Sequence, residues 1–200
     1  MFITIEGLDG SGGTTQVERL RAEWARRAPE REVVCTREPS PGPVGRLLRQ
    51  ALADVTIGEG VLPYLFAADR RDHLDRVVLP ALARGAVVIS DRYALSSLAY
   101  QSLALGLDKV AALNADFPAP DLTVLLDLPP AECLARIDAR GAAKERFETL
   151  ARLEEIAAGY EAALLRVPTW RIARIDAAGT PDDVAARVTA AAFPEGPWPR

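Results

Sequence analysis

The stretch GLDGSGGTT, at residues 7–15, decides the fold, because it follows the alternating apolar run Phe2–Ile5 and opens a helix-like segment. An apolar strand, a glycine-dense turn and a helix start place several backbone N–H groups around one point, where the helix dipole also favours negative charge. The stretch therefore predicts a loop that binds phosphate, although glycine-rich turns also occur without a ligand. The residues expected to bind phosphate are Gly7, Gly10, Ser11, Gly12, Gly13, Thr14 and Thr15.

The loop departs from the usual phosphate-binding pattern at one position. That pattern is G-x-x-x-x-G-K-[ST], and Gly7, Gly12 and Thr14 fit it. Gly13 stands where a lysine would reach the outer phosphates, and it offers only its backbone amide. Charge for those phosphates would have to come from elsewhere in the chain.

Length and composition predict a single domain at 1–193 and a proline-rich tail at 194–200. A chain of 200 residues can bury a full core without disulfides or a metal. No run approaches the roughly 20 apolar residues of a membrane helix, and the start is not basic as in a signal peptide, so a cytoplasmic protein without membrane contact is expected. The net charge of −4 argues against a nucleic-acid partner, which would need an extended basic surface.

Cysteine and histidine usage argues against a zinc site. Cys35 and Cys133 lack the spacing of metal ligands and lie among apolar neighbours, which predicts two buried, reduced thiols. The chain has one histidine, His73, which is interpreted as a surface or supporting residue rather than a catalyst.

Strand-like and helix-like segments alternate along the chain. The near-continuous apolar runs Val87–Ser90 and Leu122–Leu126 are typical of strands buried on both faces of a parallel sheet. The order predicts a doubly wound α/β fold with about five parallel strands flanked by helices. The other predicted strands are Phe2–Ile5, Glu32–Thr36 and Trp170–Ile175, and the predicted helices after the loop are Val44–Leu52, Leu62–Arg84, Pro130–Arg140, Leu150–Leu165 and Thr180–Ala192.

Charged residues follow three of these strands, at the sheet edge where ligands of such folds bind. Asp91 is suited to hold a hydrated magnesium ion together with the Thr14 hydroxyl. Arg37 and Arg92 can each fork onto a second phosphate. Taken singly, such residues are often solvated loop residues or helix caps, and only their coincidence with the loop favours function.

The predicted helix Leu62–Arg84 breaks its own apolar stripe, since Asp69, Arg70 and His73 occupy positions expected in the core. Phe66 and Arg70 are four residues apart and share one face, so they can hold a planar base between a ring and a guanidinium donor. The alternative is a partly solvated helix in which Arg70 pairs with Asp69 or another neighbour.

Two further segments carry polar residues at helical spacing. Ser96 and Tyr100, like Ser97 and Gln101, are four apart, which suits contact with the edge of a base and its sugar, whereas a helix N-cap is the simpler reading. The other segment is basic and is predicted to be a lid at about 140–149, although a basic helix end would look similar. Its cations are Arg136, Arg140, Lys144 and Arg146.

Together these motifs resemble the thymidylate kinases, of the nucleoside monophosphate kinase group, over nearly the whole chain. The resemblance is carried by the loop with its internal Asp9, by TREP at 36–39, LFAADR at 65–70, DRY at 91–93 and the serines and AYQ that follow, and by a basic lid ending at 146–148. It implies transfer of a phosphoryl group from MgATP to dTMP, and it implies a homodimer.

The resemblance also implies roles for individual residues. Phe66 would stack on thymine, and Arg70 would bond its carbonyl. Ser97 or Gln101 would touch the base edge, Ser96 would also belong to the dTMP site, and Tyr100 would exclude a ribose 2′-hydroxyl. Asp9 would contact the 3′-hydroxyl or the metal shell, and Arg37 and Arg92 the monophosphate. ATP would be bound by the loop with Arg136, Arg140 and Lys144, and the residues implied in catalysis are Asp9, Arg92, Arg136, Arg140 and Arg146.

Gly13 departs from the family pattern and leaves other hypotheses open. Since Gly10 and Ser11 follow Asp9 where an arginine can stand, the chain looks like the subgroup whose catalytic arginines come from the lid. One alternative is a nucleotide-binding protein that has lost catalysis and acts as a sensor or partner subunit. Another is a kinase for a different deoxynucleoside monophosphate.

Overall fold

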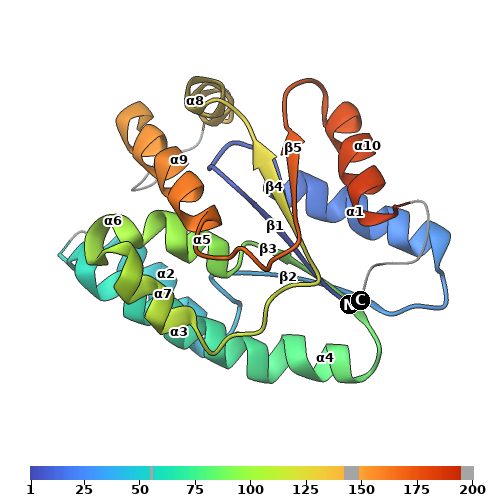
Figure 1. Cartoon of the computed structure of the whole chain (residues 1–200), viewed down its shortest axis with the longest axis horizontal. Coiled ribbons are helices and arrows are strands. Elements are labelled where there is room, and N and C mark those ends of the chain that lie inside the picture. Colours follow the sequence, from blue (N-terminus) through green and yellow to red (C-terminus); the bar gives the residue numbers. More distant parts are fainter. Residues whose placement is uncertain (55, 142–148, 195–200) are drawn as a thin grey trace.

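A parallel sheet with strand order β2-β3-β1-β4-β5 lies at the centre of the computed structural model, which describes residues 1–54, 56–141 and 149–194 (Figure 1). All neighbouring strands in this described part pair in parallel. The doubly wound, five-stranded α/β fold predicted from the sequence is therefore confirmed. The strands are β1 (Phe2–Gly7), β2 (Val33–Arg37), β3 (Val87–Asp91), β4 (Leu122–Asp127) and β5 (Ile172–Asp176).

The three inner strands are apolar because both of their faces are covered. Every residue of β1 is buried, and β3 and β4 are buried up to their last residue. Their charged residues, Glu6, Asp91 and Asp127, stand at or next to the carboxyl ends. The charged side chains of these strands therefore lie at one edge of the sheet.

Helices cover both faces of the sheet (Figure 1). Helices α1 and α10 pack together on one face, α1 against β1, β2 and β3 and α10 against β4 and β5. On the other face α5 packs on β1 and α9 packs on α5. The helices are α1 (Gly13–Arg27), α2 (Pro43–Ala53), α3 (Leu62–His73), α4 (Leu79–Ala83), α5 (Ala94–Tyr100), α6 (Ser102–Leu105), α7 (Leu107–Asn114), α8 (Pro130–Ala139), α9 (Leu150–Leu164) and α10 (Pro181–Ala192), with a 3₁₀ turn η1 at Glu59–Val61.

The helix expected at Leu62–Arg84 is not one regular α-helix. A π-helical turn, η2 (Leu74–Val78), separates α3 from α4, and the Leu79 N–H bonds to the carbonyl of Leu74. Pro80 explains the widening, because it has no N–H for the carbonyl four residues earlier and its ring clashes with that carbonyl. Helices α6 and α7 were not predicted, since their short segments show no long apolar stripe.

The cysteine prediction is confirmed for Cys133, which is buried, while Cys35 is only partly buried. Both are free, and burial raises the pKa of each thiol to about 11, so both are neutral at physiological pH. Among the described residues no helix has the length and apolar character needed to cross a bilayer.

Candidate functional site

The loop between β1 and α1 bends back on itself at glycines. Gly7, Gly10 and Gly12 have φ angles of 148°, 87° and 102°, which other residues rarely adopt. A Cβ on Gly10 would lie 2.4 Å from the Cys133 carbonyl oxygen. The loop therefore packs its backbone tightly on α8, and its residues line a cavity of about 330 Å³.

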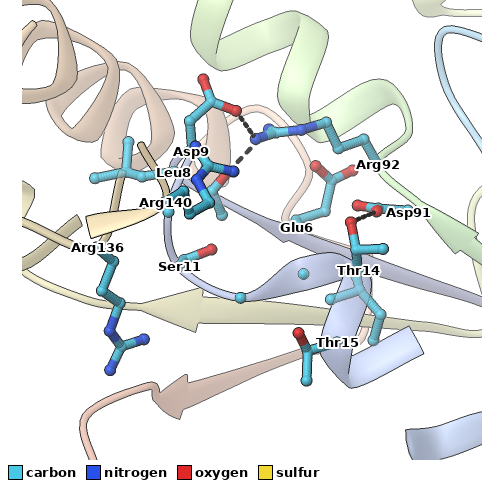
Figure 2. A pocket seen from close by; sticks show the side chains of 15 residues that line it. Glu6, Leu8, Asp9, Ser11, Thr14, Thr15, Asp91, Arg92, Arg136 and Arg140 are labelled. Carbon is cyan, nitrogen blue, oxygen red and sulfur yellow. Dashed lines mark hydrogen bonds and ion pairs between the residues drawn. The ribbon is translucent and has the colours of Figure 1, made fainter. Parts of the chain in front are cut away.

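Charged side chains from the loop and from three other parts of the chain surround this cavity (Figure 2). The other parts are the end of β1, the end of β3 with the residue after it, and α8 with its C-cap. The structure thus brings together the predicted phosphate loop, the pair after the third strand and the first two cations of the basic segment. These charged residues are Glu6, Asp9, Asp91, Arg92, Arg136 and Arg140.

The predicted metal pair is in contact. The Thr14 hydroxyl donates a 2.6 Å hydrogen bond to Asp91 Oδ2 at the mouth of the cavity (Figure 2). Gly13, the first residue of α1, faces the same carboxylate, and a Cβ there would lie 3.1 Å from Asp91 Oδ1. One hydroxyl and one carboxylate suit Mg²⁺, which keeps several waters and takes other ligands from phosphates.

Arg92 joins the loop to α5. Its φ of 72° is unusual for a residue with a side chain. Its guanidinium donates to the Gly7 carbonyl at 2.8 Å, to Asp9 Oδ1 at 2.6 Å and to Ser96 Oγ at 3.1 Å. It also lies 4.9 Å from the ring centroid of Tyr100. A cation held at this point by neutral and acidic groups can receive a phosphate at the loop.

Arg37 and Tyr100 complete the surroundings of Arg92. Arg37 is exposed at the end of β2, opposite Asp91 in the β2–β3 pairing. The Tyr100 hydroxyl donates to Asp9 Oδ2 at 3.3 Å. Neither residue lines the cavity of the glycine loop.

Tyr160, on α9, is a site residue that the sequence pattern did not reveal. Its hydroxyl accepts from the Gly7 N–H at 3.1 Å and lies 3.0 Å from the Gly7 carbonyl, to which it can donate. Burial raises the pKa of this hydroxyl, so it stays a neutral donor. The preceding Gly159 permits the approach, since a Cβ there would be 2.5 Å from the Ala99 carbonyl oxygen.

Glu6 was also missed, although a carboxylate inside an apolar strand run is itself a signal. It is 1% exposed and lines the cavity. Ser96 Oγ donates a short hydrogen bond to Glu6 Oε2, and the Tyr160 hydroxyl lies 3.4 Å from the same oxygen. Burial raises the pKa of Glu6 to about 7.

The polar face of α3 has a partner that the sequence did not indicate. Arg70 is 1% exposed, and its Nε and Nη2 donate to Glu38 Oε2 at 2.9 and 2.6 Å. Nη2 also donates to Ser97 Oγ at 3.0 Å and Nη1 to Asn114 Oδ1. The alternative of a solvated Arg70 paired along its own helix is therefore wrong.

Asp69 and His73 bind the end of β2 and the segment that follows it. Asp69 Oδ2 accepts from the Ser40 N–H at 2.7 Å. His73 is buried, with Nε2 2.6 Å from Thr36 Oγ1 and Nδ1 3.1 Å from Glu38 Oε1. His73 is thus a supporting residue, and a surface position for it is excluded.

The remaining predicted base contacts do not line the phosphate cavity. Phe66 is partly buried against the apolar cluster of Leu48 and Leu62. Ser97 and Gln101 are buried on α5 and at its C-cap. The two serines diverge, because Ser96 faces the phosphate loop while Ser97 faces Arg70.

The basic segment is described only in part. Arg136 and Arg140 line the cavity, and Arg136 Nη2 donates to the Ala177 carbonyl at 3.0 Å. Lys144 and Arg146, and with them most of the predicted lid at 140–149, lie outside the described residues.

Comparison with known proteins gives consistent matches. A model of the thymidylate kinase family matches residues 5–188. Thymidylate kinase of Xanthomonas oryzae pv. oryzae is 46% identical over 165 residues, which cover 80% of this chain and 72% of the relative. Thymidylate kinase of Xanthomonas campestris pv. campestris is 44% identical over 185 residues, which cover 92% of this chain and 79% of the relative. Probable thymidylate kinase of Pyrobaculum aerophilum is 41% identical over 189 residues, which cover 94% of this chain and 93% of the relative.

Proposed function

The chain belongs to the thymidylate kinase family, and on that premise we propose how its own residues phosphorylate dTMP. The reaction moves the γ-phosphoryl group of ATP to dTMP, giving ADP and dTDP for dTTP synthesis. A dTMP phosphate oxygen attacks the γ-phosphorus in line, without a covalent enzyme intermediate. Catalysis then comes from positioning and from stabilising charge.

The ATP phosphates are placed at the glycine loop, whose amides and helix dipole favour anions. Thr14, Asp91 and water would hold Mg²⁺, which would neutralise charge on the phosphates. Arg136 and Arg140 face the same cavity and supply positive charge that Gly13 lacks. Lys144 and Arg146 are proposed to add to it when ATP is bound.

The dTMP phosphate is placed at Arg92, with Arg37 near it at the strand edge. Asp9 would contact the 3′-hydroxyl or the metal shell, and Tyr100, bonded to Asp9, would leave no room for a 2′-hydroxyl. The position of Arg92, held between the loop and α5 and facing the cavity, is the observation that carries this proposal.

The thymine base is placed against Phe66, Arg70, Ser97 and Gln101. The contacts of Arg70 leave one Nη1–H without an acceptor among the described residues. The Ser97 hydroxyl accepts from Arg70, so its own proton can be donated to a carbonyl. The Arg70 Nη1–H and the Ser97 hydroxyl are then two neighbouring donors, which suit the carbonyl edge of thymine.

A panel of acceptors tests this function. With saturating MgATP, we expect kcat/KM for dTMP to exceed those for dCMP and dGMP by about tenfold or more, because a site built for particular hydrogen bonds rejects bases that cannot make them. For dUMP, which makes the same hydrogen bonds, we expect a loss of about tenfold, because it lacks the 5-methyl group and its apolar contact. ADP release measures the rates, with Asp91→Ala as the metal-site control. A higher value with another monophosphate would contradict the dTMP assignment, and dTMP binding without turnover would favour the sensor or partner subunit.

We also propose that the chain forms a homodimer through α2, η1 and α3. These neighbouring elements carry exposed apolar side chains, with Leu47 54%, Val61 49% and Tyr64 53% exposed. Large apolar groups at a surface are typical of subunit contacts.

Light scattering should give the mass of a dimer. Tyr64→Glu is expected to raise the dimer dissociation constant by about tenfold or more, because it places a charge in an apolar contact. Leu165→Glu is the matched control, since Leu165 is 82% exposed at the end of α9 and should leave the dimer intact. A monomeric wild type, or a dimer lost only with Leu165→Glu, would exclude this interface.

A further inference from the structure

Glu6 occupies an unusual position for a carboxyl group. It precedes Gly7 at the end of β1, is 1% exposed, and lines the cavity of the phosphate loop. Figure 2 shows it between Arg92 and the Thr14–Asp91 pair. The phosphate-binding mechanism described above gives it no role.

Its two oxygens differ. Oε2 accepts from Ser96 Oγ, which in turn accepts from Arg92 Nη1 at 3.1 Å. Oε1 is buried, and no group in the described part of the chain bonds to it. A buried polar atom without a partner calls for an explanation. A proton could sit on Oε1 without disturbing the bond from Ser96.

The charges facing Glu6 come from several elements. Arg92 and Ser96 approach from the β3–α5 turn and α5, and Tyr160 from α9, while Arg70 and Glu38 act from farther away. The positive charge of Arg92 is already shared with Asp9 in an ion pair at 2.6 Å. A phosphate dianion arriving at Arg92 would therefore meet two carboxylates.

Repulsion between like charges favours the neutral form of the more buried acid. Burial, opposed by the Ser96 hydrogen bond and by the charges of Arg92 and Arg70, raises the pKa of Glu6 to about 7 in the free protein. Asp9 keeps its direct ion pair with Arg92, whereas Glu6 is linked to Arg92 through the hydroxyls of Ser96 and Tyr160. Glu6 is thus the group that a nearby phosphate would protonate most easily.

We propose that Glu6 takes up one proton from solvent when the phosphate of dTMP binds at Arg92, and that the resulting carboxylic acid donates a hydrogen bond from Oε1 to a phosphate oxygen. The inference rests on the proposed placement of dTMP. No other bond is made or broken, and the buffer supplies the proton. Glu6 then becomes a phosphate-binding residue rather than a passive part of the strand.

Calorimetry of dTMP binding without ATP or metal tests the proposal directly. At pH 8 the dTMP phosphate, with a second pKa of about 6, is almost wholly dianionic and exchanges few protons itself. The enthalpy is measured in buffers of different ionisation enthalpy, and its slope gives the protons taken up. For the wild type we expect about half a proton or more per dTMP, and a dissociation constant that rises with pH above 7, because uptake opposes high pH.

Three comparisons isolate Glu6. E6Q keeps a donor at this position but cannot titrate, so its proton uptake should be near zero and its dTMP affinity nearly independent of pH between 7 and 9. Thymidine lacks the phosphate and should bind the wild type without uptake. An infrared difference spectrum of the wild type should gain a carboxylic-acid C=O band on dTMP binding, which does not depend on a folded variant.

Each outcome decides between the ideas. If dTMP binds without proton uptake, or E6Q takes up as many protons as the wild type, the role of Glu6 is overturned while the proposed function stands. If thymidine causes the same uptake, or ATP alone does, the proton does not respond to the dTMP phosphate. If dTMP does not bind at all, the proposed function falls together with this inference.

Discussion

The Arg140→Ala variant is expected to phosphorylate dTMP with kcat lowered by about 10²-fold or more, the usual loss when one positive donor to a transition state is removed. Arg140 is the C-cap residue of α8 and lines the phosphate cavity with Arg136. Because Gly13 brings no charge to the outer phosphates, the remaining cations have a larger share of that task. The measurement is ADP release at saturating ATP and dTMP.

Two variants control for charge and for position. Arg140→Lys keeps the charge but loses the planar fork, so its loss should be smaller. Arg166→Ala removes an exposed arginine that pairs with Asp108, away from the residues lining the cavity, and should leave kcat unchanged. An Arg140→Ala enzyme with wild-type kcat would reject the role of Arg140.

Gly13→Lys belongs to the same prediction, and is expected to change kcat by about tenfold or less. Its Cβ would lie 3.1 Å from Asp91 Oδ1, so the new side chain begins by crowding the proposed metal carboxylate. Gly13→Ala isolates that crowding from the added charge. Saturating ATP is needed, since a lysine can tighten ATP binding without changing the chemical step. If Gly13→Lys raised kcat a thousandfold from near zero while Arg140→Ala left kcat unchanged, the result would favour a protein that has lost catalysis.

Arg70→Ala is expected to lower the free energy of unfolding by about 3–5 kcal/mol, because it leaves the buried Glu38 carboxylate without its main partner. The Arg70 and Glu38 side chains are 1% and 2% exposed. Ser97 and Asn114 lose a donor as well. Urea unfolding followed by circular dichroism measures the change.

Arg71→Ala is the matched control, one residue along the same helix. Arg71 is exposed and pairs with Asp75, so its loss should shift the unfolding midpoint far less. The double variant Glu38→Ala/Arg70→Ala should be less destabilised than the sum of the single variants, since neither charge is then left alone. Equal effects at positions 70 and 71 would show that the buried pair is not structurally important. A weaker dTMP affinity of Arg70→Ala can be read as lost base contact only where the variant is folded.

The fold and the phosphate loop were predictable because their signals are local. An apolar strand, glycines and a helix start within residues 2–15 are sufficient for the loop, and parallel strands deliver their polar ends to one edge. Asp91 and Arg92, which this logic put at that edge, line one cavity with the loop, as do Arg136 and Arg140 of the predicted basic segment. The roles of these residues stay predictions.

Only the tertiary structure decided which polar groups meet. The stripe of α3 indicated that something polar lies opposite Arg70, but its partner Glu38 is 32 residues earlier, and Tyr160 reaches Gly7 across 153 residues. Helical spacing reports which face of a helix is covered, not which element covers it. Likewise, Glu6 becomes a titrating group only because α5 and α9 close over β1 and exclude water from its carboxyl, and that burial is a property of the packed molecule, which no local sequence pattern contains.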